Sequence, residues 1–338
     1  MGIQKVLLGM GAGDAWEEAG ITATGGTMHT GQLNPDGTPY TWHVFPGGPR
    51  GPETNLTYDF DVTAVSGPGK FEYIMVAGGG MGGMSPNPDP GGSYGGAGGG
   101  GAGGVICNFE SPPAQATTTY HPFYPVSPGA QTASVQAYPI SVGRAAAGNP
   151  APERKGKDTS FLGLTAVGGG WGAHANSGTN AGSGGSGGGG GEPPGGTSGA
   201  SGTTNQGKAG GDGEPANAGG GGGASTGGGG ASGAGGTGIM FDDAGYFKLS
   251  VGGITDNPGQ PGYRYLAGGG GGGGPSGSGF RPGGGGYGGG GDAGNPNGNG
   301  GNADNWSGGG GGAAGGGANT MPGGLGGQGM VFIRSVAD

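Results

Sequence analysis

FEYIMVAGGGMGG (71–83) passes without a break from a strand-like segment into a run of glycines. Its first seven residues are rich in the aromatic and β-branched types that favour strands. The same junction recurs at DTSFLGLTAVGGG (158–170), and GMVFIRSV (329–336) closes the chain as a strand-like segment that follows a glycine tract. Strands joined directly to glycine tracts indicate that the glycines belong to a folded body.

Glycine makes up 107 of the 338 residues and proline 26, whereas average usage is about 7% Gly and about 5% Pro. Only 10% of the residues are charged, so the high charge of most disordered chains is missing. Unbroken runs such as 268–274 do not follow the Gly-X-Y repeat of collagen. A flexible linker is one remaining interpretation, but large apolar residues among the glycines favour an ordered array: Trp171, Ile239, Phe241, Tyr263, Phe280, Tyr287, Trp306 and Leu325.

Other short segments also have the composition of strands, and turn signals such as PDGTP and PGGPRGP separate the first of them. Glycine and proline at this density rule out stable helices. The sequence therefore predicts a mostly β and irregular fold with essentially no α-helix. The further strand-like segments are 38–45, 57–63, 104–110, 137–143 and 246–253.

We expect three parts along the chain. Residues 1–20 form an N-terminal segment, and residues 21–77 form a small antiparallel β module. Residues 78–338 form a glycine-rich domain, which the strand 330–336 closes. The boundary between the last two parts falls where the strand at 71–77 meets its glycine tract.

Glycine tracts can become structure as packed helices of the polyproline-II type, with three residues per turn and about 3.1 Å rise. Such a helix has no internal hydrogen bonds, so its N–H and C=O groups must bond to neighbouring helices. Only glycine lets the backbones approach closely enough. Ordering each residue costs roughly 1–2 kcal/mol, and each hydrogen bond returns about 0.5–1.5 kcal/mol. A bundle of this kind therefore needs apolar clamps and a folded domain beside it.

Charge and motif patterns argue against most kinds of chemistry. The net charge is −9, and the dispersed Lys and Arg form no basic stripe for nucleic acid. No apolar run approaches the ~20 residues of a membrane span. His29, His43, His121 and His174 lack metal-ligand spacing, and we find neither a phosphate-binding motif nor a catalytic triad. We therefore expect a non-enzymatic protein without cofactor, metal, nucleic acid or membrane insertion.

Two smaller features have ordinary structural interpretations. Asp59 and Asp61 share one face of a predicted strand, where a solvated sheet face is favoured over a cation site. Cys107 is the one cysteine, so no internal disulfide can form. Its apolar neighbours Val105 and Ile106 favour an inert, buried thiol.

The landmarks between the glycines occur in a recognisable order: FEYIMVAGGGMGG (71–83), GAGGVIC (101–107), YPISVGR (138–144), TSFLGLTAVGGGWG (159–172) and GGLGGQGMVFIRSV (323–336). This order resembles the glycine-rich domain of bacteriophage tail-fibre and adhesin proteins. Upstream, TGGTMHTGQ and YTWHVFPGG resemble the short hairpin module that precedes the domain. The resemblance covers about residues 20–338. It implies layered polyglycine helices whose loops at the far end bind a receptor on the host surface.

On this resemblance, aromatic and polar residues in exposed loops are the candidates for receptor contact, because such side chains offer large amphipathic area. The alternative role for each of them is to clamp the side of the glycine body. The receptor candidates are Tyr94, Trp171, His174, Phe280, Tyr287 and Trp306. The candidates for attachment to the virion are Val6, Leu7, Leu8 and Trp16.

The resemblance implies a virion protein made in the host cytoplasm, namely a tail-fibre or tail-tip adhesin. Its partners are then other virion proteins and a host surface receptor, either protein or glycan. A capsid-decoration or head-fibre subunit without receptor binding is the first alternative. An ice-binding or matrix protein is the second alternative. The sequence leaves open whether the unit is a monomer or a homotrimer.

Overall fold

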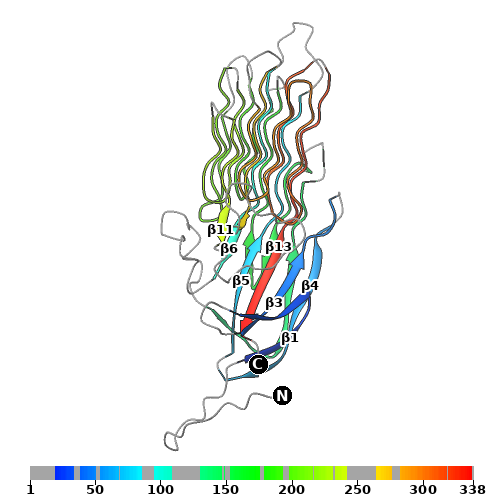
Figure 1. The fold of residues 1–338 in the computed structure, drawn as a ribbon, viewed down its shortest axis with the longest axis vertical. Helices are drawn as coiled ribbons and strands as arrows, with labels where there is room; N and C mark the ends of the chain where they lie inside the picture. Colours follow the sequence, from blue (N-terminus) through cyan, green and yellow to red (C-terminus); the bar gives the residue numbers. More distant parts are fainter. Residues whose placement is uncertain are drawn as a thin grey trace, which may run out of the picture.

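A computed structural model describes most of the chain, and its strands and irregular segments confirm the predicted mostly-β class. The described residues contain no helix. The molecule is elongated, with a β sandwich at one end and long parallel and antiparallel tracts at the other (Figure 1). The described ranges are 20–33, 39–50, 54–67, 69–85, 95–108, 130–146, 148, 153–175, 179–192, 198–215, 217–230, 233–241, 264–275, 282–317 and 319–336.

The first sheet of the sandwich, which we call sheet A, is antiparallel and has the order β1-β4-β8-β9-β10. Phe60 and Val62 on β4 point inward, whereas Asp59 is exposed and Asp61, between Phe60 and Val62, is half-buried. This alternation is the period of two that half-buried strands require, and it confirms the solvated sheet face predicted at Asp59. The strands are β1 (Gly20–Thr24), β4 (Leu56–Ser66), β8 (Gln136–Val142), β9 (Thr159–Phe161) and β10 (Leu164–Ala166).

The second sheet, sheet B, has the order β2-β3-β13-β5-β6, and β7 pairs with the start of β5. The last strand of the chain, β13, therefore lies in the middle of the sheet, antiparallel to both β3 and β5. Both sheets combine strands from either side of the expected boundary at residue 77. The strands are β2 (Thr27–Leu33), β3 (Pro39–Pro46), β5 (Lys70–Val76), β6 (Val105–Cys107), β7 (Gln131–Thr132) and β13 (Met330–Val336).

An aromatic cluster fills the core between the two sheets. The ring of Phe60 in sheet A meets Phe71 in sheet B edge-to-face at 5.4 Å between centroids. Tyr73 and Phe161 meet in the same way at 5.3 Å. Such pairs contribute about 0.5–1.5 kcal/mol beyond the burial of their area. The sandwich thus has a conventional hydrophobic core of its own.

The opposite face of sheet B packs against a second cluster, which includes Trp42, Phe332, Ile239 and Leu266. Ile239 belongs to β11 (Ile239–Phe241) and Leu266 to β12 (Arg264–Leu266), a two-stranded sheet. Ala102, Ala224 and Ala267 from the glycine tracts belong to the same cluster. This cluster therefore joins the sandwich to the tracts.

Most strand-like segments of the sequence are strands in the structure. The segments at 38–45, 57–63, 71–77, 137–143 and 329–336 correspond to β3, β4, β5, β8 and β13. In the segment 104–110, residues 105–107 form β6 and residues 109–110 lie outside the described residues. The segment 158–170 divides into β9 and β10 around a tight turn at Leu162 and Gly163, where both φ angles are positive. The segment 246–253 lies outside the described residues.

The glycine tracts are joined by backbone hydrogen bonds whose partners repeat every three residues. In the tract 98–104, the N–H groups of Gly98, Gly101 and Gly104 donate to one antiparallel tract at 2.8–2.9 Å. Residues 99 and 102 donate to a second tract, and residues 100 and 103 to a third. The carbonyl groups follow the same cycle with three other tracts. A period of three is that of the polyproline-II helix and favours the conformation predicted from the sequence.

The tracts lie so close together that side chains have no room between them. A Cβ atom added to Gly98, Gly99 or Gly101 would fall inside the carbonyl group of a neighbouring tract. The methyl groups of Ala97, Ala175 and Ala313, by contrast, meet one another in a small cluster. Every N–H of the tract 98–104 has a backbone acceptor, so no donor in this tract is buried without a hydrogen bond.

Candidate functional site

The glycine body, defined as the tracts between residues 77 and 329, has two different ends. At the near end the tracts continue into strands such as β5 and β13, and at the far end they turn back (Figure 1). Described residues close two of these far-end turns with hydrogen bonds. Glu214 and Asn217 pair with each other across one turn, and Gly298 donates to the Asn295 carbonyl at 2.7 Å in the other. Their exposed Asn, Pro and Glu residues make a polar tip.

The structure describes only part of the set of residues predicted from the sequence. Among the receptor candidates, Tyr94 and Phe280 lie outside the described residues. The same holds for the attachment candidates Val6, Leu7, Leu8 and Trp16.

Trp171 lies along the side of a glycine tract and not in a loop. Its ring lies against Gly182 of the neighbouring tract, so closely that a Cβ on Gly182 would overlap the indole. Its Nε1 donates to the Asn180 carbonyl at 3.1 Å, and the side chain is half-buried. These contacts are those of a lateral clamp.

His174 lies in the far part of the same tract and is also engaged by the body. Its Nδ1 accepts a hydrogen bond of 2.8 Å from the Met84 N–H, so the neutral ring carries its proton on Nε2. That Nε2 is buried and has no hydrogen-bond partner within the described part of the chain. Burial, followed by the charge of Arg154, lowers the pKa of His174 to about 4. The ring is therefore neutral at neutral pH.

We expect His174 to make the fold sensitive to acid. The unfolded chain has the ordinary pKa of 6.5 and binds a proton more readily than the folded chain, whose pKa is about 4. This contribution to stability is complete above pH 6.5 and is lost as the pH falls towards 4. In His174→Asn, Oδ1 can still accept the Met84 N–H, but no titration remains. Between pH 7 and pH 4, the melting temperature of this variant should fall less steeply than that of the unchanged chain. Equal slopes would contradict a role for His174 in the acid sensitivity.

Tyr287 and Trp306 lie at the near end, whereas the sequence analysis placed them with the receptor loops. Tyr287 is 52% exposed and its ring lies 5.5 Å from that of Tyr265 on β12. Trp306 packs against the cluster on sheet B, and its Nε1 donates to the Gly47 carbonyl at 3.1 Å. Residues 295–306 form a far-end turn, a tract and a near-end turn, so Trp306 does not lie in a far-end loop.

A connection between the sandwich and the tracts went unnoticed in the sequence. Arg50, in the loop after β3, donates from Nε to the Gly326 carbonyl at 3.0 Å and from Nη2 to the Ala303 carbonyl. Arg144, at the end of β8, donates to the Pro49 carbonyl at 2.7 Å. The motif PGGPRGP gave only a turn signal, because its charged residue has no local partner in the sequence. These bonds attach tracts to the sandwich at a second place.

Side-chain oxygens accept hydrogen bonds from glycine N–H groups at the margins of the body. Asp292 accepts from Gly285 at 2.7 Å, and Asp212 accepts from Gly199 at 2.8 Å. Asp158 accepts in the same way from Gly168 at 2.7 Å. A carboxylate is a strong acceptor. Part of the acidic character of the chain thus has a structural role, since it ends the lateral hydrogen-bond network.

The marginal carboxylates can be tested at Asp292. Asp292→Ala removes the acceptor of the Gly285 N–H and should lower the free energy of unfolding by about 0.5–1.5 kcal/mol. Asp292→Asn keeps an Oδ1 acceptor and should retain more of that stability. Chemical denaturation of the two variants and the unchanged chain measures the difference. Equal stability of all three chains would show that water replaces the carboxylate.

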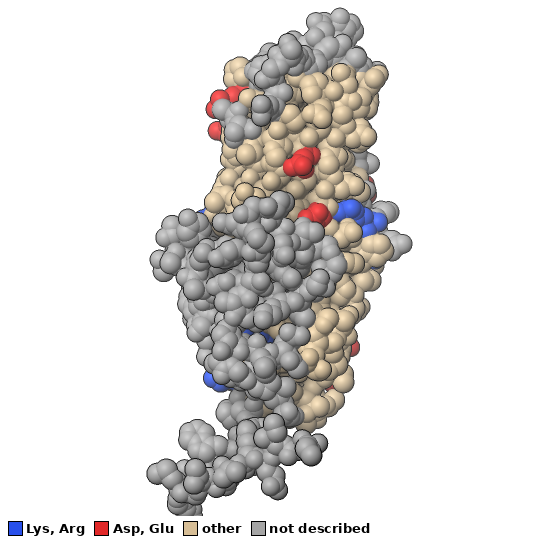
Figure 2. Space-filling model, in the orientation of Figure 1, with Lys and Arg blue, Asp and Glu red and all other residues tan. Residues whose placement is uncertain are grey.

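The described ranges contain neither a cluster of metal ligands nor a membrane-spanning helix. Within them, no three His, Cys, Asp or Glu side chains come together as metal ligands would. The same ranges hold no helix of the length and hydropathy needed to cross a membrane. On the face in Figure 2, charged side chains are few on the described surface of the glycine body.

The chain matches a family model described as a glycine-rich domain over residues 54–336. Because this match covers most of its length, the chain belongs to that family. The match runs from just before β4 to the end of β13, so the family includes most of the sandwich as well as the tracts. No curated protein matches the chain.

Proposed function

We propose that the protein is a non-enzymatic binding protein of a bacteriophage particle, a tail-fibre or tail-tip adhesin. In this proposal the sandwich end faces the particle and the far end of the glycine body faces the host. A receptor on the host surface, either protein or glycan, is the partner at the far end. Other virion proteins are the partners at the sandwich end.

The observation that carries the proposal is that the two ends of the molecule differ in structure. The first and last described residues, Gly20 and Val336, pair with Ser66 and Tyr40 at the end of the sandwich away from the tracts. The tracts reverse direction at the opposite end of the molecule (Figure 1). A protein that is attached at one end and presents turns at the other has the geometry of an adhesin.

The packing of the tracts supports the same proposal. Loops that carry function are best displayed by a rigid scaffold, and close backbone packing leaves the tracts little freedom to move. Glu214 in one far-end turn and Asn295 and Asn297 in the other are exposed. Because tracts end in turns at the far end, changes in those turns would leave the hydrogen-bonded interior intact. Such a body can hold variable loops at fixed positions.

Two measurements test the proposal. An antibody raised against the purified protein should label the tail of the virions in electron microscopy. Purified protein in excess should also slow the adsorption of the same virions to their host, because it occupies the receptor. Label on the capsid together with unchanged adsorption would overturn the adhesin and favour a head-fibre or capsid-decoration subunit. The matched control is a variant in which residues 295–298 are replaced by glycine and serine. This change alters a far-end turn and leaves the hydrogen-bonded interior of the glycine body intact.

A further inference from the structure

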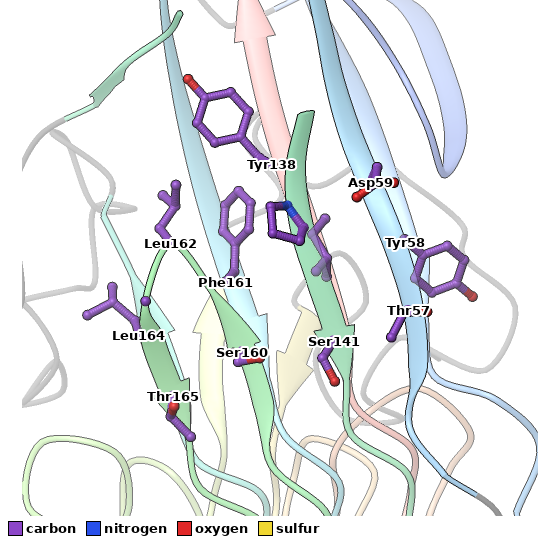
Figure 3. A pocket seen from close by; sticks show the side chains of 13 residues that line it. Thr57, Tyr58, Asp59, Tyr138, Ser141, Ser160, Phe161, Leu162, Leu164 and Thr165 are labelled. Atoms are coloured by element: carbon purple, nitrogen blue, oxygen red, sulfur yellow. The ribbon is translucent and has the colours of Figure 1, made fainter. Parts of the chain in front are cut away.

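We infer that the outer face of sheet A carries a carbohydrate-binding groove, formed by β4, β8, β9 and the β9–β10 hairpin. Figure 3 shows this face, with sheet B behind it. The groove encloses about 550 Å³. It lies on the sandwich and not at the far-end turns, so it goes beyond the proposed function. It would serve a tail adhesin and a head-fibre subunit equally.

A row of four hydroxyl side chains crosses the groove. Thr57 on β4 is paired with Ser141 on β8, Ser141 with Ser160 on β9, and Ser160 with Thr165 on β10. Neighbouring strands lie about 4.8 Å apart, so the hydroxyl groups form a regular ladder. Thr57 and Thr165 are exposed, and the two serines between them are half-buried. All four residues line the groove.

One of these hydroxyl groups is oriented by the protein. Asn55 donates from Nδ2 to Ser141 Oγ at 3.1 Å and to the Asp158 carbonyl at 2.9 Å. Because Ser141 Oγ accepts this bond, its own proton remains to be donated elsewhere. A hydroxyl held in this way is ready to donate to a ligand oxygen.

The rest of the lining selects the class of ligand. Asp59 supplies a carboxylate next to the ladder, and Pro139 and Leu162 supply apolar surface. No Lys or Arg is among the described residues that line the groove, which disfavours phosphate, sulfate and other anions. The backbone groups of β4 and β8 are occupied by the sheet, which disfavours an added peptide strand. Neutral sugars fit this lining, since they offer many hydroxyl groups and an apolar ring face.

The backbone at Leu162 gives a second, independent indication. Leu162 has φ 53° and is followed by Gly163 with φ 73°. Tight hairpin turns with two positive φ angles prefer Asn-Gly or Gly-Gly, and a bulky residue is strained there. The strained residue lines the groove, and its half-buried side chain also packs against the core between the two sheets. Strain of this kind gathers at binding sites.

The test uses the full chain on a printed array of neutral and anionic oligosaccharides, followed by titration of the strongest binder. The variant Asp59→Asn with Ser160→Ala removes the carboxylate charge and one hydroxyl of the ladder. It should bind that oligosaccharide about tenfold more weakly or worse, as expected for the loss of one hydrogen bond and of the charge that strengthens another. The matched control is Asp61→Asn with Thr63→Ala, on the same face of β4 but outside the groove.

Three results would overturn the groove: no bound oligosaccharide, binding to anionic sugars alone, or equal weakening by both double variants. Thermal melting of each variant separates a lost site from a lost fold. The groove and the proposed function fail separately. If the groove variant no longer binds the oligosaccharide but still slows adsorption, the proposed function stands without the groove. If the unchanged chain binds the oligosaccharide but does not affect adsorption, the groove stands without the proposed function.

Discussion

Gly99→Ala should prevent the protein from folding. The new Cβ would overlap the Gly270 carbonyl oxygen and stand 2.8 Å from the Gly221 nitrogen. The Gly221 N–H donates to that same Gly270 carbonyl at 2.8 Å, so the new methyl group would break this hydrogen bond between two tracts. Ordinary overpacking, which side chains can relieve, costs about 1–3 kcal/mol. A clash between backbones should cost more and leave little soluble, folded protein.

The matched control is Gly284→Ala. Gly284 is exposed, and the nearest atom to its added Cβ is Asp292 Oδ1 at 3.8 Å. Replacement at a compatible position reduces the freedom of the unfolded chain and stabilises by about 0.4–1 kcal/mol. Soluble yield and thermal melting should therefore separate the two variants clearly. A Gly99→Ala chain that melts within a few degrees of the control would refute the close packing of the tracts.

The sequence was sufficient for features that depend on neighbouring residues. The aromatic and β-branched residues of 71–77 and 57–63 predicted β5 and β4, because strand propensity depends on the residues of the segment itself. The threefold cycle of hydrogen bonds was likewise expected from the glycine backbone alone. These features need no knowledge of where distant segments lie.

The arrangement of the tracts could not be read in the same way. Every glycine is chemically alike, so nothing in 98–104 specifies that it donates to 167–173 and accepts from 77–83. The central position of β13 depends equally on segments far away in sequence. One usable signal was overlooked. Asn-Pro-Asn-Gly at 295–298 marks a turn, so Trp306, one tract later, had to lie at the opposite end.

The groove on sheet A also could not be predicted from the sequence. Thr57, Ser141, Ser160 and Thr165 are ordinary residues of three separate segments, of which 158–170 contains the last two. Only the register of β4, β8, β9 and β10 places their hydroxyl groups in one row. A site that depends on the register between strands has no sequence motif, because no single segment contains more than two of its residues.

Phe332→Ala should destabilise the sandwich and the glycine body together. Phe332 is fully buried in β13, in the cluster that joins sheet B to the tracts. Removing a buried phenylalanine side chain costs about 3–5 kcal/mol. Val135→Ala, at a residue 64% exposed, should change stability by less than about 0.5 kcal/mol and is the control.

The more informative result is how the two parts respond. Hydrogen bonds in the tracts contribute about as much as ordering the glycines costs, so the body has little stability of its own. It therefore depends on strands such as β13, which continues from the tract at 321–329 into the middle of sheet B. Near-ultraviolet circular dichroism follows the aromatic core, and amide exchange follows the glycine N–H groups. Both should report one transition, shifted equally by Phe332→Ala. Tracts that stay protected after the sandwich melts would show that the glycine body folds by itself.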